Sequence, residues 1–460
     1  MNYSDSERIS TVLKNIGLEK TNDIEEADIL IFNTCSVRQS AEDRIWGLQK
    51  NIRKLKLKRN IKLCTRKYKL PLTILTGCMC KRSRNTKISI LKEKGYLDQL
   101  KSKALNIDIF LKIEDICKLT QILRCQKKYS HPNNYLKIKP DYSSKYKAYV
   151  LISTGCDEFC SYCIVPYARG EEKDRSSEEI ISEIKKLVSK GYKDIMLLGQ
   201  SVNSWKNRKK QKPRNFLELL RELDKIEGNF WLSYLSSHPF YFTQGLVDYF
   251  AYSCNKGTEM LNKNLQLTTR NHIRPYLNLA MQSGSNKILY KMNRKYTISK
   301  FVSICKKLKK IIPNLNLSTD IIVGFPEETE SDFQKTKNIF KLLKFDIAYI
   351  NKYSQRNGTL ASQIEDNIKL KEKKRREKEL TKILKMHAFE NNKKYIGQIH
   401  TALTDTIKKE NEKYYVYGKL FNFKDIKIRL KNYNDAKVGE FIRVKIINTK
   451  MMSLEGVITD

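Results

Sequence analysis

The chain has 460 residues, 40% of them hydrophobic, which is enough for two or three domains with buried cores. Its 89 Lys and Arg against 50 Asp and Glu give a net charge of +39, which favours a polyanionic partner such as nucleic acid. A proteome-wide bias toward basic residues would give a similar excess. No apolar run approaches the ~20 residues that span a bilayer, and the start lacks a secretory pattern. We therefore expect a cytoplasmic protein with no membrane association, whose 11 reduced cysteines indicate metal or redox chemistry.

Residues 1–125 have the pattern of a small α/β domain. Apolar residues at helical spacing from Ile9 to Ile16 precede an apolar run that leads into NTCSV, and a second apolar run, PLTILTGC, also ends in cysteine. Because parallel strands end at one edge of a sheet, we expect the two strands to bring Cys35 and Cys78 to a common site. Residues 126–146 are polar and contain two prolines, which predicts a linker.

Strand and helix patterns alternate over the next part of the chain, which we assign to one domain, residues 147–385. The strand AYVLIS leads into a cysteine-rich loop, and a capping pattern at Ser176 and Glu179 opens the following helix. Repeated β–α units predict parallel strands that form a barrel or partial barrel, with the active site at the carboxyl ends of the strands. The further strands are KDIMLLG, WLSYLSS, YLNLAMQSGS, NLSTDIIVGFP and FDIAYINKYS.

The last part of the chain changes pattern twice. The segment KLKEKKRREKELTKILKMHAFENNKK predicts a long charged helix, either a solvated face or a surface for RNA phosphates. After Tyr395, five short alternating segments predict a small β-barrel of the oligonucleotide-binding type over residues 392–459. The fold class is therefore α/β, with a small N-terminal domain, a partial (β/α) barrel and a terminal β-barrel.

The strongest chemical signal is the segment TGCDEFCSYC, in which Cys156, Cys160 and Cys163 are spaced C-x3-C-x2-C. Thiolates on one tight loop can hold an iron–sulfur cluster, and three ligands for four irons leave one iron open to a small molecule. A structural zinc site would need a fourth Cys or His, and none is adjacent. The spacing therefore predicts a cluster with an open iron.

This spacing is the signature of radical-SAM enzymes, and other segments narrow the resemblance. The ordered segments TGCDEFCSYCIVPYARG, LLGQSVNSW, SSHP, LNLAMQSGS, MNRKYT, STDIIVGFPEET and YSQRNGT resemble the methylthiotransferases over nearly the whole chain. NTCSVR and TGCMC resemble that family's N-terminal cluster domain, and the terminal segment resembles its TRAM domain, a small RNA-binding barrel. LLGQSVNSW is similar to the branch that modifies isopentenyl-adenosine beside the anticodon. The branches acting on threonylcarbamoyl-adenosine or on a ribosomal protein usually carry different residues there.

The resemblance implies two [4Fe-4S] clusters and S-adenosylmethionine as cofactors. The cluster at Cys156, Cys160 and Cys163 would bind S-adenosylmethionine and release a 5′-deoxyadenosyl radical, which takes hydrogen from carbon 2 of the adenine. The second cluster, at Cys35 and Cys78, would supply the methylated sulfur that passes to this carbon. The implied partners are the anticodon stem-loop of a tRNA and an electron donor such as flavodoxin or ferredoxin, and we expect a monomer.

Loops at strand ends supply the other candidate cofactor residues. They would border the methionine, ribose and adenine parts of the cofactor, and glycine would permit a close backbone approach. A barrel loop with a glycine turn is the alternative for each. These residues are Gly199, Gln200, Gln282, Ser283, Gly284, Val323 and Gly324, the last two within the segment 322–325.

Three further polar residues near these motifs have two interpretations each. Arg169 and Arg175 follow the cysteine loop and could bind cofactor or RNA phosphate, or form surface ion pairs. His238 in SSHP is expected to cap or pack rather than to catalyse.

The N-terminus departs from the family pattern. The family's auxiliary cluster uses three cysteines, the first just before a segment that MNYSDSE matches, and here only Cys35 and Cys78 have counterparts. One hypothesis is a misassigned start codon or a truncated gene. The other is that Cys80, Cys64 or a non-cysteine group replaces the ligand. A third hypothesis, from another class, is an RNA-binding or electron-transfer protein with a relic cluster, which would not cleave S-adenosylmethionine.

Overall fold

The computed structural model divides into two compact units. The first unit comprises Met1–Ser143, Thr154–Lys173 and Ser354–Ile364, and the second unit comprises Ser144–Ser153, Asp174–Tyr353 and Glu365–Asp460. The first unit therefore contains the cysteine loop together with the N-terminal residues. The structure describes residues 1–36, 39–60, 71–80, 106–123, 134–207, 212–264, 266 and 271–459. No helix within these ranges is long and apolar enough to cross a membrane.

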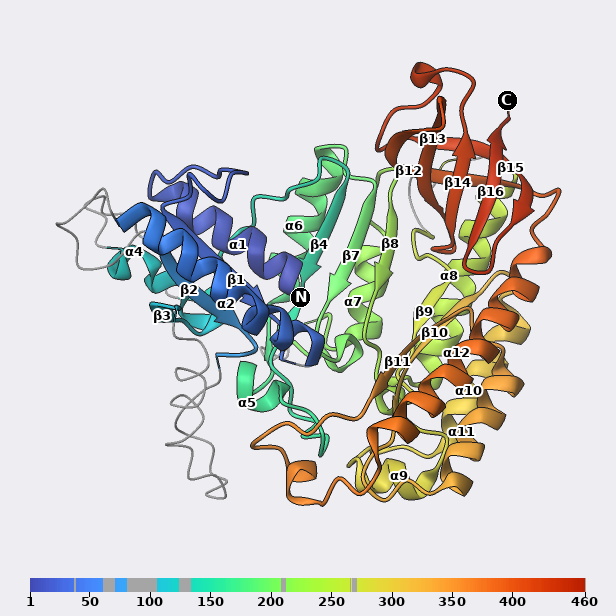
Figure 1. The fold of residues 1–460 in the computed structure, drawn as a ribbon. Coiled ribbons are helices and arrows are strands. Elements are labelled where there is room, and N and C mark those ends of the chain that lie inside the picture. Colours follow the sequence, from blue (N-terminus) through green and yellow to red (C-terminus); the bar gives the residue numbers. More distant parts are fainter. Residues whose placement is uncertain are drawn as a thin grey trace. The chain divides into compact units, whose positions relative to one another are not determined.

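The first unit contains a small parallel sheet with strand order β1-β2-β3, against which α1 and α2 pack (Figure 1). β2 is buried at every position, as expected for a central parallel strand covered on both faces. This arrangement confirms the predicted α/β layer. The elements are α1 (Asn2–Asn15), β1 (Ile29–Thr34), α2 (Gln39–Asn60), β2 (Leu72–Gly77), β3 (Ile109–Phe110), a 3-10 turn (Ile113–Lys118), α4 (Leu119–Ile122) and a second 3-10 turn (Tyr135–Lys137).

Two later segments of the chain complete the first unit. The cysteine loop ends in the short helix α5 (Val165–Arg169), and the segment Ser354–Ile364 contains the 3-10 turn Leu360–Gln363. The Ala361 N–H donates to the Ser161 carbonyl at 2.7 Å, which ties this segment to the loop. Two short strands, β5 (Ser153–Thr154) and β6 (Lys173–Asp174), pair at the base of the loop.

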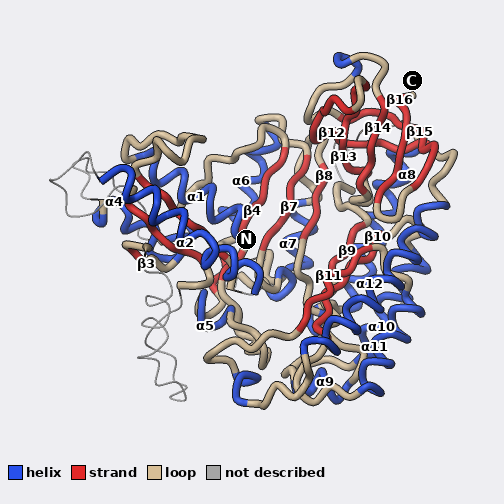
Figure 2. The backbone as a smooth tube through the Cα atoms, in the orientation of Figure 1, coloured by secondary structure: helices blue, strands red, loops and turns tan. Residues whose placement is uncertain are grey.

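The second unit is built on parallel strands in the order β4-β7-β8 and β9-β10-β11. Parallel bridges from Leu232 to Ile273 and from Ser237 to Leu279 connect the two sheets, so six strands follow one another in chain order. This is the predicted partial barrel, and Figure 2 shows its strands with helices alongside. The strands are β4 (Lys147–Leu151), β7 (Asp194–Leu198), β8 (Trp231–Tyr234), β9 (Tyr276–Asn278), β10 (Asn316–Val323) and β11 (Ile347–Lys352).

Helices alternate with these strands and carry the capping chemistry that their sequences predict. The Ser176 hydroxyl accepts from the Glu179 N–H at 3.3 Å and caps α6, while Gly191 beyond its end has a φ of +83°. The helices are α6 (Ser177–Ser189), α7 (Phe216–Leu223), α8 (Gln244–Asn262), α9 (Asn286–Lys291), α10 (Ile298–Ile311), α11 (Glu330–Leu343) and α12 (Leu370–Lys393), with 3-10 turns at Val202–Ser204 and Pro239–Tyr241.

The chain ends in a closed five-stranded barrel with the order β12-β13-β14-β16-β15, as predicted. Val416, Ile428, Val444 and Leu454 are among the residues that fill its interior. The five strands are β12 (Ile399–Glu410), β13 (Lys413–Leu420), β14 (Asp425–Arg429), β15 (Phe441–Thr449) and β16 (Ser453–Ile458), and a 3-10 turn spans Tyr433–Asp435.

One buried arginine holds the barrel to the strands of the second unit. The Arg274 guanidinium donates to the carbonyls of Leu420 and Phe421 at 2.5 and 2.8 Å and to the Asp194 carboxylate at 3.0 Å. Its charge also lies 4.7 Å from the ring centre of Trp231. A fully buried cation is stable only with such partners, so the joint depends on this side chain.

We predict that Arg274→Leu lowers the free energy of unfolding by about 3–5 kcal/mol, because it leaves the Asp194 carboxylate and two carbonyls buried without a donor. Urea unfolding would measure the loss. Arg221→Leu is the control, since the exposed Arg221 lies over the Tyr249 ring and its removal should cost less than about 1 kcal/mol. Equal losses in the two variants would contradict the anchoring role.

Candidate iron–sulfur and cofactor sites

The cysteine loop of the first unit closes on itself around one glycine. Gly155 has a φ of +79°, and a Cβ added there would lie 2.0 Å from the Glu171 carbonyl oxygen. The next N–H, that of Cys156, donates to the Gly170 carbonyl at 3.1 Å, so the two ends of the loop are in direct contact. Glycine precedes the first cysteine because a side chain at this position would collide with the backbone at the other end of the loop.

The side chains of the three loop cysteines have limited exposure. Cys160 is buried, and Cys156 and Cys163 are half-buried. Burial raises the pKa of Cys156 to about 12, so this thiol is protonated until a metal displaces the proton. No three His, Cys, Asp or Glu side chains of the described ranges are arranged to hold a single metal ion. The donor set of three thiols on one tight loop fits a [4Fe-4S] cluster, in which each thiolate binds a different iron.

We predict that Gly155→Ala prevents iron loading at this loop, because the added methyl group collides with the Glu171 carbonyl. Iron and sulfide counts after anaerobic reconstitution would show the loss. Gly191→Ala is a matched control: Gly191 has nearly the same φ, +83°, but nothing within 4 Å of an added Cβ. That variant should lose about 1–2 kcal/mol of stability and keep its iron. Full iron loading in Gly155→Ala would show that the close approach is dispensable.

A second pair of thiols lies at the carboxyl edge of the first unit's sheet. Thr34 of β1 is in register with Gly77 of β2, so Cys35 and Cys78 leave neighbouring strands side by side. The Cys78 N–H also donates to the Thr34 carbonyl at 3.0 Å. The structure thus brings these two cysteines together, as the strand patterns predicted. Their thiols fit two ligands of one cluster.

The structure separates the third-ligand candidates from this pair. The Cys80 thiol donates to the Leu75 carbonyl at 3.1 Å and packs in the hydrophobic cluster with Ile45 and Met79. Burial raises its pKa to about 12, so Cys80 belongs to the core. Cys64 lies outside the described residues.

Arg169 of α5 lies beside the cysteine pair and forms a buried ion pair. The sequence suggests instead a surface ion pair, or a contact of Arg169 with cofactor or RNA phosphate. Its Nη2 is 2.5 Å from Asp5 Oδ2, and its Nε donates to Cys78 Sγ at 3.3 Å. Burial opposes the charge, but the Asp5 carboxylate together with Cys78 and Tyr135 outweighs burial and raises the pKa of Arg169. The Tyr135 hydroxyl donates to the same carboxylate. The sequence carried no signal for this contact, because Asp5 and Arg169 are 164 positions apart.

Arg175 is also a structural residue here. Its Nη1 lies 2.6 Å from the Glu183 carboxylate and donates to the Leu151 carbonyl at 2.8 Å. In the second unit it therefore joins α6 to β4.

The predicted cofactor residues of the second unit all lie at or beyond the ends of parallel strands. Gly199 and Gln200 follow β7, the segment 282–284 follows β9, Val323 is the last residue of β10, and Gly324 comes directly after it. The strand order places them at one carboxyl edge. Gln282 has a φ of +64° and Gly324 a φ of +70°, so these loops turn sharply as they leave the sheet.

Packing accounts for two of the glycines. A Cβ on Gly284 would lie 2.5 Å from the Thr336 backbone of α11, and one on Gly324 would lie 2.4 Å from the Lys373 side chain of α12. Gly199 is different, because its added Cβ would first meet the Ser153 hydroxyl, at 2.8 Å. Ser283 is fully buried in the same turn as Gly284.

Unpaired hydroxyls mark this edge as suited to a polar ligand. The side-chain oxygens of Ser201, Ser233 and Ser237 are buried and have no hydrogen-bond partner within the part of the chain that the structure describes. A buried hydroxyl without a partner is costly, and a bound ligand with donors and acceptors would satisfy it. The residues of this edge therefore fit S-adenosylmethionine.

His238 is a capping residue, as expected. Its Nδ1 accepts from the Phe240 N–H at 3.2 Å at the start of a 3-10 turn. Burial, reinforced by the charge of Arg294, lowers its pKa to about 2. The imidazole is therefore neutral at physiological pH.

We predict that this histidine makes the fold acid-sensitive. Because the folded pKa is lowered, the unfolded chain binds more protons below about pH 6.5, so the stability present above that pH is lost as pH falls. By pH 5 the loss from His238 should reach about 2 kcal/mol. His238→Asn keeps a capping acceptor without the titration, and its unfolding free energy should fall less between pH 7 and pH 5. Parallel pH profiles for the two proteins would contradict this cause.

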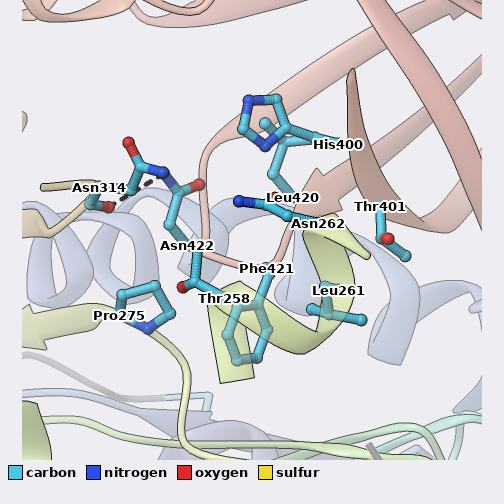
Figure 3. Close-up of a pocket in the computed structure, with 10 residues that line it drawn as sticks. All are labelled: Thr258, Leu261, Asn262, Pro275, Asn314, His400, Thr401, Leu420, Phe421 and Asn422. Atoms are coloured by element: carbon cyan, nitrogen blue, oxygen red, sulfur yellow. Dashed lines mark hydrogen bonds between the residues drawn. The ribbon is translucent and has the colours of Figure 1, made fainter. Parts of the chain in front are cut away.

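The cavity drawn in Figure 3 lies in the second unit where α8 meets the barrel. It is lined by residues that include Thr258, Leu261, His400 and Phe421, and its volume of about 20 Å³ suits about one water molecule. Asn422 closes one side by donating to the Asn314 carbonyl at 3.2 Å. The cavity is part of a packed joint and is too small for a cofactor.

Comparison with known proteins identifies two families whose models match this chain. The Radical SAM superfamily matches residues 150–339, and the Uncharacterized protein family UPF0004 matches residues 1–100. Among solved structures, the radical S-adenosylmethionine methyltransferase TsrM from Kitasatospora setae, with cobalamin and a [4Fe-4S] cluster bound, is 12% identical with a TM-score of 0.49. That match covers 78% of this chain and 73% of TsrM.

Two sequence relatives cover almost the whole chain. The tRNA-2-methylthio-N(6)-dimethylallyladenosine synthase of Clostridium botulinum (strain Hall) is 37% identical over 99% of this chain and 94% of the relative. The protein of the same name from Clostridium novyi (strain NT) is 36% identical with the same coverage. The chain belongs to the radical-SAM methylthiotransferase family, in the branch of these synthases. Membership confirms [4Fe-4S] clusters and S-adenosylmethionine as its cofactors.

Proposed function

We propose that the protein transfers a methylthio group to carbon 2 of N6-isopentenyladenosine beside the anticodon of tRNA. The observation that carries the proposal is the presence of two cysteine sites in one compact unit. These are the C-x3-C-x2-C loop and the in-register pair Cys35 and Cys78. Relatives at 36–37% identity carry the name of this activity.

The cysteine sites define how the chain would divide the work. Cys156, Cys160 and Cys163 hold one cluster with an open iron, and Cys35 and Cys78 hold the auxiliary cluster. When bound, these groups and S-adenosylmethionine supply radical chemistry at a C–H bond that no side-chain base could deprotonate, together with the sulfur. The chain's own contribution is the tight closure of the loop at Gly155, which holds the three thiols close together.

The strand-end loops of the second unit hold S-adenosylmethionine in this proposal. Gly199 offers its backbone next to the Ser153 hydroxyl, and the buried hydroxyls of Ser201 and Ser237 accept or donate to the cofactor's polar groups. Gln200 and the segments 282–284 and 322–325 line the same edge. These residues orient the cofactor by hydrogen bonds and close backbone packing.

The terminal barrel is suited to the RNA. On its outer face the Lys427 ammonium lies 3.9 Å from the ring centre of Tyr415, and Lys408 lies 5.5 Å from that of Tyr417. The ammonium groups can contact phosphates, and the aromatic rings beside them can stack on unpaired bases. We place the anticodon stem-loop there. The proposal further includes a flavodoxin or ferredoxin as electron donor, a monomeric enzyme and a cytoplasmic location.

Anaerobic reconstitution of the full chain tests this proposal. Iron would be counted per protein, and 5′-deoxyadenosine and the methylthio nucleoside would be assayed with tRNA that carries or lacks the isopentenyl group. We expect two clusters, cofactor cleavage and a product only from isopentenylated tRNA. Cys160→Ala should lose cleavage by more than about 1,000-fold, since the loop then has two ligands.

Each other outcome excludes a part of the proposal. Cleavage without a thiolated product would mean that the Cys35–Cys78 site supplies no sulfur. A product on threonylcarbamoyl-adenosine or on a ribosomal protein would change the substrate and keep the chemistry. A chain with iron but no 5′-deoxyadenosine would be an RNA-binding or electron-transfer protein.

A further inference from the structure

Arg169 connects the two cysteine sites of the first unit. It is the last residue of α5, six positions after Cys163, and only 2% of it is exposed. Its guanidinium donates through Nη2 to the Asp5 carboxylate at 2.5 Å and through Nε to Cys78 Sγ at 3.3 Å. One rigid group thus contacts a carboxylate on α1 and a sulfur at the end of β2, while its backbone belongs to the cysteine loop.

The surroundings fix the direction of this guanidinium. Asp5 is fully buried and also accepts from the Tyr135 hydroxyl, so the carboxylate cannot turn away from its partners. Because a guanidinium is planar, a carboxylate bound at Nη2 determines where Nε points. Here Nε points at Cys78 Sγ. A buried cation that served only as a partner for Asp5 would not need a sulfur acceptor.

We propose that Arg169 is a positioning residue that donates a charge-assisted hydrogen bond to the Cys78 thiolate of the auxiliary cluster and raises the reduction potential of that cluster. The inference rests on the proposed function, in which Cys78 is a cluster ligand. Hydrogen bonds to ligating sulfurs and nearby positive charge favour the reduced cluster, which carries one more negative charge. Asp5 moderates the effect, because its carboxylate partly neutralises the guanidinium.

This arrangement makes the two halves of the ion pair act in opposite directions. Arg169→Gln removes the positive charge and leaves the Asp5 carboxylate, so the auxiliary cluster should become harder to reduce. Asp5→Asn leaves the positive charge uncompensated, so the cluster should become easier to reduce. The double variant removes both charges and should lie between the two. Loss of structure alone would not give shifts of opposite sign.

The test is a redox titration of the auxiliary cluster by electron paramagnetic resonance in the full chain. Replacing Cys156, Cys160 and Cys163 by Ala removes the other cluster, so only the auxiliary signal remains. At the wild-type midpoint, Arg169→Gln should lower the ratio of reduced to oxidised cluster about tenfold, the lower end of the effect of one hydrogen bond to a charged group. Asp5→Asn should raise this ratio. Arg169→Lys keeps the charge but lacks the planar set of guanidinium donors. It should lower the ratio of reduced to oxidised cluster less than Arg169→Gln does.

The buried ion pair of Asp346 and Lys424, 2.8 Å apart in the second unit, provides the control. Asp346→Asn and Lys424→Gln should destabilise the fold about as much as Asp5→Asn and Arg169→Gln do. They should leave the reduction potential of the auxiliary cluster unchanged. If Arg169→Gln does not retain its cluster, the potentials of the double variant and of Arg169→Lys can still be compared with those of the wild type and of Asp5→Asn.

Two outcomes overturn the inference while the proposed function stands. The first is a wild-type potential in Arg169→Gln, and the second is a shift of the same sign in Arg169→Gln and Asp5→Asn. A wild-type chain that loads one cluster and forms no methylthio product would instead refute the ligand role of Cys78, and the proposed function with it.

Discussion

Parallel strands finish at the same edge of a sheet, and both units of this protein depend on that constraint. In the first unit the register between β1 and β2 places Cys35 beside Cys78. In the second unit, strands that follow one another in chain order bring the loops after β7, β9 and β10 to one edge. The proposed cluster and cofactor residues therefore lie at or just beyond strand ends, where backbone groups are no longer used by the ladder and can turn toward a ligand.

A buried arginine ties together distant parts of the chain in each unit. Arg169 and Arg274 are both buried, and each donates to one carboxylate and to at least one further acceptor from a distant part of the chain. A guanidinium can do this because its donors point in several fixed directions within one plane. In a chain of net charge +39, positive residues are abundant, but these two, like Arg8, are 2% exposed or less. Their pairing partners are thus part of the fold, and Asp5 and Asp194 could not be exchanged for neutral residues without cost.

Local pattern was enough to predict most of the secondary structure and the strand ends that bring Cys35 beside Cys78. Alternating apolar runs gave the strands and the terminal barrel, and glycine before Cys156 marked a loop that crowds its own backbone. What the pattern could not give was contacts between distant residues. Arg274 reaches the Phe421 carbonyl across 147 positions, and no period or motif relates these two residues. Glycines were ambiguous for the same reason, because only the fold shows that Gly284 packs against α11.

Cys78 and Cys80 are separated by one residue and yet have opposite surroundings. The first lies beside Cys35 and Arg169, and the second donates to the Leu75 carbonyl inside the core. Because Cys80 is turned inward, the pair of sulfurs at this edge comes from two strand ends instead of from one turn. A Cys78–Cys80 pair would be adjacent even in the unfolded chain, whereas Cys35 and Cys78 meet only when β1 and β2 are in register. The site is therefore present only in the folded sheet.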